Sequence, residues 1–163
     1  MNSLENINNK IIRDWSLLPE ILMDWKNNNQ KIVFTNGCFD IIHRGHIELL
    51  SRAADLGQKL IVALNTDSSV KRLKGPERPF QDEASRSMIM GAFDFVDLVI
   101  LFPQDTPQEL IKIVNPDILV KGGDYKPEEI VGYDIVTANN GQVVTINFLE
   151  GYSTTKILNK LNG

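Results

Sequence analysis

Short apolar runs alternate along the chain with longer segments whose apolar residues recur at helical spacing. The short runs are rich in β-branched residues and apolar throughout, as expected for strands that are covered on both faces. The predicted strands are residues 31–35, 59–64, 97–101, 117–121 and 142–146. The predicted helices are about residues 46–56, 68–73, 82–93, 107–114, 133–139 and 154–161. An amphipathic stretch, 7–26, precedes the first strand and ends in a polar run, 27–30.

Alternation of strands and helices predicts an α/β fold, namely a Rossmann-like, doubly wound parallel sheet of about five strands. No repeat, low-complexity tract or linker divides the chain, so we expect one main domain, 31–163, after an N-terminal helical extension, 1–30. In such sheets ligands bind beyond the carboxyl ends of the strands, where the strand order reverses. The stretch 74–80, KGPERPF, is typical of a mobile loop that closes over a ligand.

Composition excludes several classes of function. The 163 residues, 42% of them hydrophobic, suffice for a core without disulfides, and the single cysteine, Cys38, indicates a reducing compartment. The start lacks the basic-then-apolar order of a signal peptide, and no apolar run approaches the roughly 20 residues needed to span a bilayer. We therefore expect a cytoplasmic protein without a membrane partner. The net charge of −4 disfavours nucleic acid but permits a small anionic ligand.

The first candidate cluster, residues 35–46, runs from the end of the first predicted strand into the first helix. His43 and His46 lie on either side of Gly45, where a backbone can approach a ligand closely and unpaired N–H groups suit phosphate oxygens. An ordinary role as a helix cap or packing residue is the alternative for each histidine. A zinc site is less attractive, because further ligands would have to come from Cys38 or scattered carboxylates.

Three more clusters follow later strands. The second contains Asn65, Asp67, Lys71 and Lys74, and a solvated helix face is its alternative explanation. The third, residues 121–125, combines a Gly-Gly pair that permits positive φ with a lysine and an aspartate, although a plain β-turn uses the same residues.

The last cluster, residues 151–156, places hydroxyl side chains at the start of a helix. By itself that pattern is a good helix N-cap. The same hydroxyls and amides also suit phosphate oxygens.

The string GCFDIIHRGH resembles the HxGH signature of the cytidylyltransferase-like nucleotidyltransferases. Further segments resemble one branch, the bacterial heptose 1-phosphate adenylyltransferases, including the adenylyltransferase half of bifunctional heptose kinase/adenylyltransferases. These segments are LIVALNTDSSVKRLKGPERP (60–79), VKGGDYKPEEIVG (120–132) and GYSTTKI (151–157). The resemblance covers about residues 31–161, and four motifs in the right order are far more specific than one HxGH.

The resemblance implies an enzyme that condenses ATP with D-glycero-D-manno-heptose 1-phosphate, with the β anomer favoured, to give ADP-heptose and pyrophosphate for lipopolysaccharide core or surface glycan synthesis. It further implies Mg²⁺ carried by the ATP phosphates without a direct protein ligand, a homo-oligomer of two or more copies, and a separate heptose kinase upstream. The sugar phosphate would attack the α-phosphorus in line, without a covalent intermediate or a strong general base, because the attacking phosphate is already ionised.

Site residues follow from the matching motif positions. Catalytic roles are implied for His43, His46, Lys74 and Thr154. Nucleotide contacts are implied for Asn36, Gly37, Cys38, Phe39, Gly45, Lys121, Gly123, Ser153, Thr154 and Thr155. Substrate contacts are implied for Asp40, Asn65, Asp67, Lys71, Arg78, Arg86, Asp124 and Tyr125. Two roles stay open for Asp40, which would either orient a histidine or reach a metal-bound water, and a structural salt bridge explains Arg86 equally well.

Rival functions remain. A cytidylyltransferase for glycerol 3-phosphate or a similar small phosphate shares the HxGH and STTK motifs. The chain also lacks the asparagine expected after Arg78-Pro79, which leaves the sugar specificity open. A nucleotide-binding regulatory module without catalysis is a second rival, disfavoured by the intact histidines and Lys74. A flavodoxin-like interaction domain that binds no nucleotide is a third.

Overall fold

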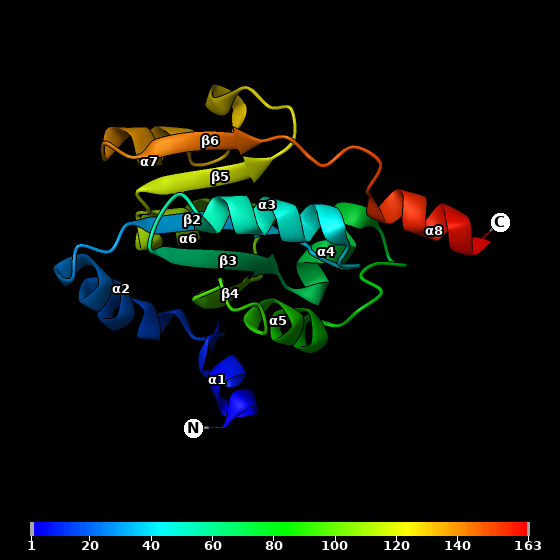
Figure 1. The fold of residues 1–163 in the computed structure, drawn as a ribbon, viewed down its shortest axis with the longest axis horizontal. Coiled ribbons are helices and arrows are strands. Elements are labelled where there is room, and N and C mark those ends of the chain that lie inside the picture. Colours follow the sequence, from blue (N-terminus) through cyan, green and yellow to red (C-terminus); the bar gives the residue numbers. More distant parts are fainter. Residues whose placement is uncertain (1, 163) are drawn as a thin grey trace.

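A computed structural model describes residues 2–162. Its centre is a six-stranded sheet in the order β1-β4-β3-β2-β5-β6, in which all neighbouring strands run parallel (Figure 1). The strands are β1 (Ile11–Ile12), β2 (Ile32–Gly37), β3 (Lys59–Asn65), β4 (Leu98–Phe102), β5 (Ile118–Gly122) and β6 (Gln142–Ile146). The predicted α/β class and doubly wound parallel sheet are thus confirmed, and the short edge strand β1 adds a sixth strand to the expected five.

Eight α-helices and two 3₁₀ helices are present in the described residues. The α-helices are α1 (Ser3–Asn9), α2 (Leu18–Asn27), α3 (Arg44–Ala54), α4 (Asp67–Lys74), α5 (Glu83–Gly91), α6 (Gln108–Val114), α7 (Tyr133–Ala138) and α8 (Thr154–Asn162). The 3₁₀ helices are η1 (Trp15–Leu17) and η2 (Pro127–Glu129). Every predicted strand and helix from residue 31 onward agrees with the structure to within two residues at each end.

The stretch 7–26 is not one amphipathic segment in the structure. The Ile11–Ile12 pair forms β1 beside Val99 and Ile100 of β4, and the Asp14 side chain caps η1 by accepting the Ser16 N–H at 2.9 Å. Its last part, α2, buries Leu18 and Leu22 in the main core. Burial of a leucine stabilises a fold by about 1.5–3 kcal/mol, so this N-terminal segment contributes substantially to the core.

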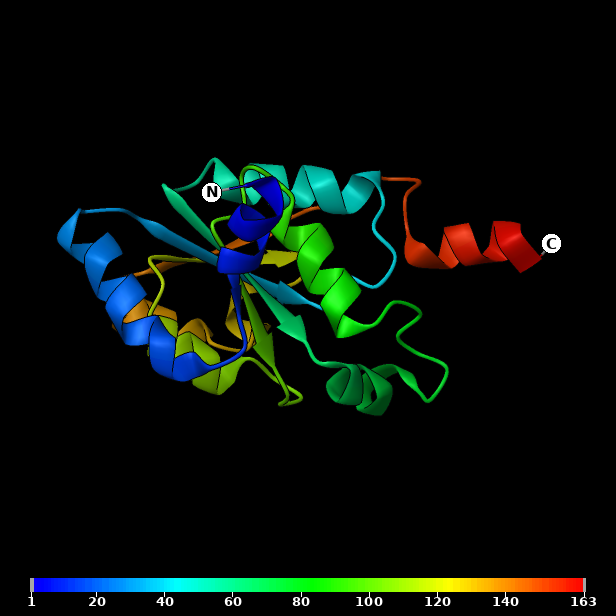
Figure 2. The ribbon, with the colours of Figure 1, turned by 90° about the horizontal axis from the view of Figure 1, so that it is seen from below.

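Side chains of each central strand alternate between two apolar layers, as the period of two in a strand requires. In β4, for example, Ile100 and Phe102 belong to the cluster that contains residues of α2, α6 and α7, whereas Val99 belongs to the cluster of α3 and α5. Figure 2 shows these two groups of helices on opposite sides of the sheet. Both faces of the sheet are therefore covered, which explains why its strands read as continuous apolar runs.

Strand order reverses beside β2, whose neighbours are β3 on one side and β5 on the other. Thr35 of β2 lies next to Val120 of β5, so the chain segments that leave these two strands emerge together. Such a switch point is where parallel sheets bind ligands. Helix α8 follows β6 and projects away from the sheet in both ribbon views (Figures 1 and 2). None of the helices in residues 2–162 has the length and apolar character required to cross a membrane.

Candidate active site

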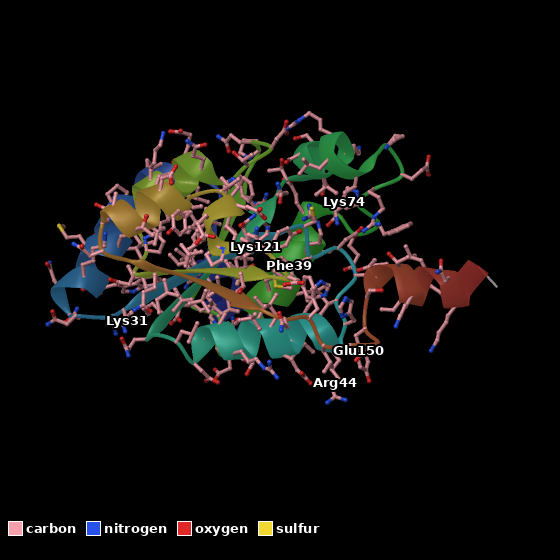
Figure 3. The ribbon with its side chains drawn as sticks, turned by 90° about the horizontal axis from the view of Figure 1, so that it is seen from above. Lys31, Phe39, Arg44, Lys74, Lys121 and Glu150 are labelled. Carbon is pink, nitrogen blue, oxygen red and sulfur yellow. The ribbon has the colours of Figure 1, made fainter. Side chains whose placement is uncertain are left out.

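A cavity of about 200 Å³ lies at the switch point, and we call it the central cavity. It is lined by Thr35, Asn36, Gly37, Cys38, Phe39, His46, Leu49, Lys74, Lys121, Gly122, Tyr125 and Phe148. In Figure 3, Phe39 and Lys121 lie near the middle of the molecule, and Lys74 lies above and to the right of them, at the end of α4. Lys31, which precedes β2, lies at the left of the view, away from these three residues. The fold thus brings the first three sequence clusters together at the carboxyl ends of the strands.

Two further cavities adjoin the central one. The α8 cavity, of about 400 Å³, shares His46 and Phe148 with it and is lined by His43, His46, Phe148, Gly151, Tyr152, Ser153, Thr154 and Lys156. The α6 cavity, of about 410 Å³, is lined by Asn36, Gly37, Cys38, Asn65, Leu73, Lys74, Asp105, Thr106, Pro107, Lys121, Tyr125, Ile130 and Val131. The central cavity therefore lies between the α8 cavity, which is rich in hydroxyls and cations, and the α6 cavity, which is lined by both apolar and polar side chains.

The two histidines are fixed by the start of α3. His43 is the N-cap residue, and its Nδ1 accepts the Gly45 N–H at 3.1 Å, while His46 Nδ1 accepts the His43 N–H at 3.4 Å. The two rings stack with their centroids 3.8 Å apart. Because each Nδ1 acts as an acceptor, the hydrogen of each neutral ring sits on Nε2. Each ring therefore offers an Nε2–H donor.

Gly45 is required by the same arrangement. A Cβ at this position would lie 3.0 Å from His43 Cε1 and 3.1 Å from His43 Nδ1. Such contacts would push the His43 ring aside by a few tenths of an ångström and so disturb its hydrogen bond to the Gly45 N–H. Glycine at position 45 thus serves the placement of His43.

Burial favours the neutral form of both imidazoles. The pKa of His46 is lowered from 6.5 to about 4, mainly by burial and in part by electrostatic repulsion from a protonated His43 and from Lys74. Burial also lowers the pKa of His43. The pKa of Lys121 is lowered overall. Burial is the main cause, Cys38 acts in the opposite direction, and the nearby Lys74 ammonium lowers the pKa as well. Neutral N–H donors beside two crowded ammonium groups form a site that favours an anion.

Asp40 has other partners than the histidine or metal-bound water that we expected. Its carboxylate is 3% exposed and accepts hydrogen bonds from Arg78 Nε at 2.8 Å and from the Phe80 and Gln81 amides at 2.9 Å. Burial alone would raise the pKa of Asp40, but these hydrogen bonds and the charge of Arg78 outweigh burial and lower it. Asp40 therefore ties the segment that follows β2 to the 74–81 loop, the stretch between α4 and α5, and Arg78 is engaged by the same contact.

Arg86 is fully buried and forms the structural salt bridge that was its alternative role. Its Nη2 donates to Asp67 Oδ1 at 2.7 Å, and its Nη1 donates to the carbonyl oxygens of Cys38 at 2.7 Å and Asn65 at 2.8 Å. Its Nε donates to the Gln81 carbonyl oxygen at 3.1 Å. The guanidinium thus joins the ends of β2 and β3, and neither Arg86 nor Asp67 lines any of the three cavities.

Some of the remaining predicted residues line a cavity and others do not. Ser153, Thr154, Asn65 and most residues of the first cluster line one or more of the three cavities, although the Ser153 hydroxyl also accepts the Lys156 N–H at 3.2 Å as an ordinary cap. Lys71, Asp124 and Thr155 are exposed and line none of these cavities. Gly123, with φ of 116°, packs beside Tyr125 and Phe148.

Phe148 is the main lining residue that sequence reasoning missed. It borders both the central and the α8 cavities, and a Cβ on Gly122 would lie only 2.7 Å from its Cε1. Asp105, Thr106 and Pro107 of the α6 cavity were also missed. All of these residues follow strands, β6 in the first case and β4 in the others, so the rule that pointed to the other clusters would have found them.

No group of three histidine, cysteine or acidic side chains within residues 2–162 is placed to hold a metal ion. The residues that line the central and α8 cavities include lysines, hydroxyls and imidazoles but no carboxylate. A divalent cation would therefore take its oxygen ligands from a bound phosphate chain.

Comparisons with known proteins agree with this architecture. Residues 34–160 match the model of the family described as cytidylyltransferase-like. The bifunctional protein HldE of Campylobacter jejuni subsp. jejuni is 56% identical over 142 residues, which cover 87% of this chain and 30% of that protein. The bifunctional protein HldE of Azorhizobium caulinodans is 53% identical over 140 residues, 86% of this chain and 29% of that protein.

The chain thus spans about a third of the length of these relatives. Among solved structures, the crystal structure of the lipopolysaccharide core biosynthesis protein from Thermoplasma volcanium is similar, with 28% identity and a TM-score of 0.59, and the match covers 76% of this chain and 99% of that one.

Proposed function

The chain belongs to the cytidylyltransferase-like family of nucleotidyltransferases, and from that premise we propose that it transfers the adenylyl group of ATP to D-glycero-D-manno-heptose 1-phosphate, in the β anomer, and releases pyrophosphate. The observation that carries this proposal is the meeting of two Nε2–H donors and two lysines, Lys74 and Lys121, between two larger cavities. This arrangement suits a reaction that joins two phosphates.

The α8 cavity is the proposed site of the leaving pyrophosphate. Its lining combines His43, the start of α8 at Thr154, and the Lys156 side chain. Amides at a helix start and a lysine are suited to bind phosphate oxygens. His46, which borders both cavities, would then donate to an oxygen of the α-phosphate.

In the reaction, an oxygen of the sugar phosphate forms a bond to the α-phosphorus while the bond from that phosphorus to the bridging oxygen of the β-phosphate breaks. Pyrophosphate leaves with the electron pair, and no proton has to be removed from the nucleophile. Neutral imidazoles therefore serve as hydrogen-bond donors, and the lysines offset the charge of the two phosphates. Mg²⁺ on the triphosphate would supply further charge neutralisation.

The sugar and the pathway rest on likeness rather than on geometry. The segments 60–79 and 120–132 carry the resemblance to heptose 1-phosphate adenylyltransferases, and the relatives reported above share this part of their sequences. We therefore also propose a product, ADP-heptose, that enters lipopolysaccharide core or surface glycan synthesis in the cytoplasm. A separate heptose kinase that supplies the substrate, and assembly into a homo-oligomer, complete the proposal.

Pyrophosphate release by the purified protein with Mg²⁺ tests the function. ATP, CTP and GTP are each combined with the β and α anomers of the heptose 1-phosphate and with glycerol 3-phosphate. We expect release only with ATP and the β anomer. His46→Ala should abolish it, while Glu109→Gln, an exposed change on α6, should leave it intact.

Turnover of CTP with glycerol 3-phosphate would replace the proposed substrates and keep the mechanism. ATP binding without release under any combination would favour a regulatory module. Absence of ATP–Mg²⁺ binding at millimolar concentration would favour an interaction domain without a nucleotide.

A further inference from the structure

The α6 cavity has no role in the mechanism as described so far. It shares Asn36, Cys38, Lys74 and Lys121 with the central cavity, but neither histidine nor any residue of α8 lines it. The two lysines therefore stand where the central and α6 cavities meet. A phosphate between them would contact both, with the rest of its molecule in one cavity or the other.

Reaction geometry decides which molecule occupies the α6 cavity. An in-line displacement places the attacking oxygen opposite the leaving group. If the pyrophosphate leaves into the α8 cavity, the acceptor phosphate approaches from the side that lies away from α8, which is the α6 cavity. This step rests on the proposed function, since it takes a sugar phosphate as the nucleophile.

The lining of the α6 cavity suits a polyhydroxylated ring. Leu73, Pro107 and Val131 supply apolar surface of the kind that packs against the C–H faces of a sugar, and Asp105 and Thr106 supply polar groups at its edge. A carboxylate accepts hydrogen bonds from hydroxyls, and a threonine hydroxyl can both donate and accept. Hydrogen bonds to these two exposed groups would distinguish acceptors by the positions of their hydroxyls.

Asp105 is held in place from one side only. Arg72 Nε donates to Asp105 Oδ1 at 2.8 Å, and Arg72 also donates to the Pro103 carbonyl oxygen. No hydrogen bond to Asp105 Oδ2 or to the Thr106 hydroxyl is present within the described residues. Both groups thus keep hydrogen-bonding capacity for a ligand.

The Asp105 loop is tied to the helix that carries Lys74. Besides the Arg72 contacts, Ser69 Oγ of α4 donates to the Gln104 carbonyl oxygen at 2.9 Å. Through these contacts, the residues that would bind the sugar and the lysine that would bind its phosphate belong to one connected unit.

We propose that Asp105 and Thr106 bind hydroxyls of the acceptor sugar in the α6 cavity and thereby determine acceptor specificity. Asp105→Asn and Thr106→Val should each raise the KM for the β-heptose 1-phosphate about tenfold, the effect of one lost hydrogen bond to the ligand. The KM for ATP should change less than about twofold, because no adenylyl contact is lost.

Two control variants separate recognition from folding. Glu109→Gln removes an exposed carboxylate from α6, the helix that follows the Asp105–Thr106 segment, and should leave both KM values unchanged. Arg72→Gln breaks the ion pair with Asp105 from the other end while it keeps the carboxylate, and it should raise the KM for the sugar phosphate far less than Asp105→Asn does. Equal effects of Arg72→Gln and Asp105→Asn would overturn the proposal, as would an unchanged KM in both cavity variants.

Direct binding keeps this test apart from that of the catalytic function. Calorimetric titration of the β-heptose 1-phosphate is carried out on the wild-type protein and on Asp105→Asn, each saturated with Mg²⁺ and a non-hydrolysable ATP analogue. Binding that weakens about tenfold in the variant supports the proposal even if no pyrophosphate is released. Absence of pyrophosphate release would contradict only the proposed function. Equal affinities, or no binding to the wild-type protein, would overturn the inference.

Discussion

Replacement of Arg86 by methionine tests the most deeply buried charge in the structure. The guanidinium has no exposed surface, and it donates to three carbonyl oxygens and to Asp67 Oδ1. Methionine fills most of the same volume but offers no donor. The change therefore leaves the ends of β2 and β3 without the group that joins them.

The expected cost is large on the scale of a single domain. Removal of one partner of a buried ion pair typically costs about 3–5 kcal/mol, because the remaining charge and carbonyl groups lose their compensation. The Asp67 side chain is 31% exposed, so water can solvate its carboxylate in the variant and offset part of the lost interaction. We therefore expect the free energy of unfolding to fall by about 3 kcal/mol, the lower end of that range. The free energy of unfolding of a domain is typically about 5–15 kcal/mol, so the variant should remain folded but be measurably less stable.

Urea unfolding followed by circular dichroism measures the effect, with Arg72→Met as the matched control. Arg72 also pairs with an aspartate but is half exposed, and its loss should cost no more than about 1 kcal/mol. Arg86→Met within about 1 kcal/mol of the wild-type stability would refute a structural role. If such a stable variant had also lost binding of the sugar phosphate, Arg86 would be a substrate contact instead.

Three further predictions follow from the same contacts. The folded-state pKa of His46, about 4, lies below its ordinary value of 6.5, so the folded protein binds fewer protons than the unfolded chain between these values, and the free energy of unfolding should fall as the pH drops from about 7 to 5. In His46→Asn this fall should be smaller by on the order of 1–2 kcal/mol. Urea midpoints that change equally with pH in the two proteins would contradict this. Asp40→Asn removes the negative charge that pairs with Arg78, so it should lower the free energy of unfolding by about 1–3 kcal/mol and speed proteolysis within the 74–81 loop. An unchanged rate of cleavage in this loop would argue against a tie between Asp40 and the loop. Gly122→Ala places a methyl group 2.7 Å from Phe148 Cε1 and so displaces a ring that lines the central cavity and the α8 cavity proposed for the leaving pyrophosphate. It should raise the KM for ATP several-fold at an unchanged KM for the acceptor, whereas an unchanged KM for ATP would contradict binding of ATP beside Phe148.

The sequence determined the course of the backbone from residue 31 onward. Each strand and α-helix there was predictable to within two residues, because apolar periodicity directly reflects which side chains a covered strand or an amphipathic helix buries, whereas the short 3₁₀ helix η2 was not predicted. It also determined where to look for the site, since in a parallel sheet the residues that follow each strand must meet at one edge. The resemblance to the cytidylyltransferase-like family is confirmed by a match over residues 34–160, a range that contains the motifs following those strands.

Short elements and long-range contacts were decided by tertiary structure alone. The two-residue strand β1 carries too few positions for any periodic signal and exists because the β4 edge offers it partners. Asp40 and Arg86 look like site residues in the sequence, yet most of their partners lie about 20 to 50 residues away and engage their polar atoms inside the protein. The neutral state of His46 likewise depends on burial, which sequence spacing does not reveal.

The same division holds for the cavities. The sequence supplied His43, His46 and the two lysines, because chemistry at a phosphate needs those residue types beyond strand ends. It did not supply Phe148 or the Asp105 loop, because an aromatic ring and a surface aspartate gain a functional meaning only from the surfaces they face. Residue type and order thus determined the fold and the candidate chemistry, while packing between distant segments decided which polar atoms were left for a ligand.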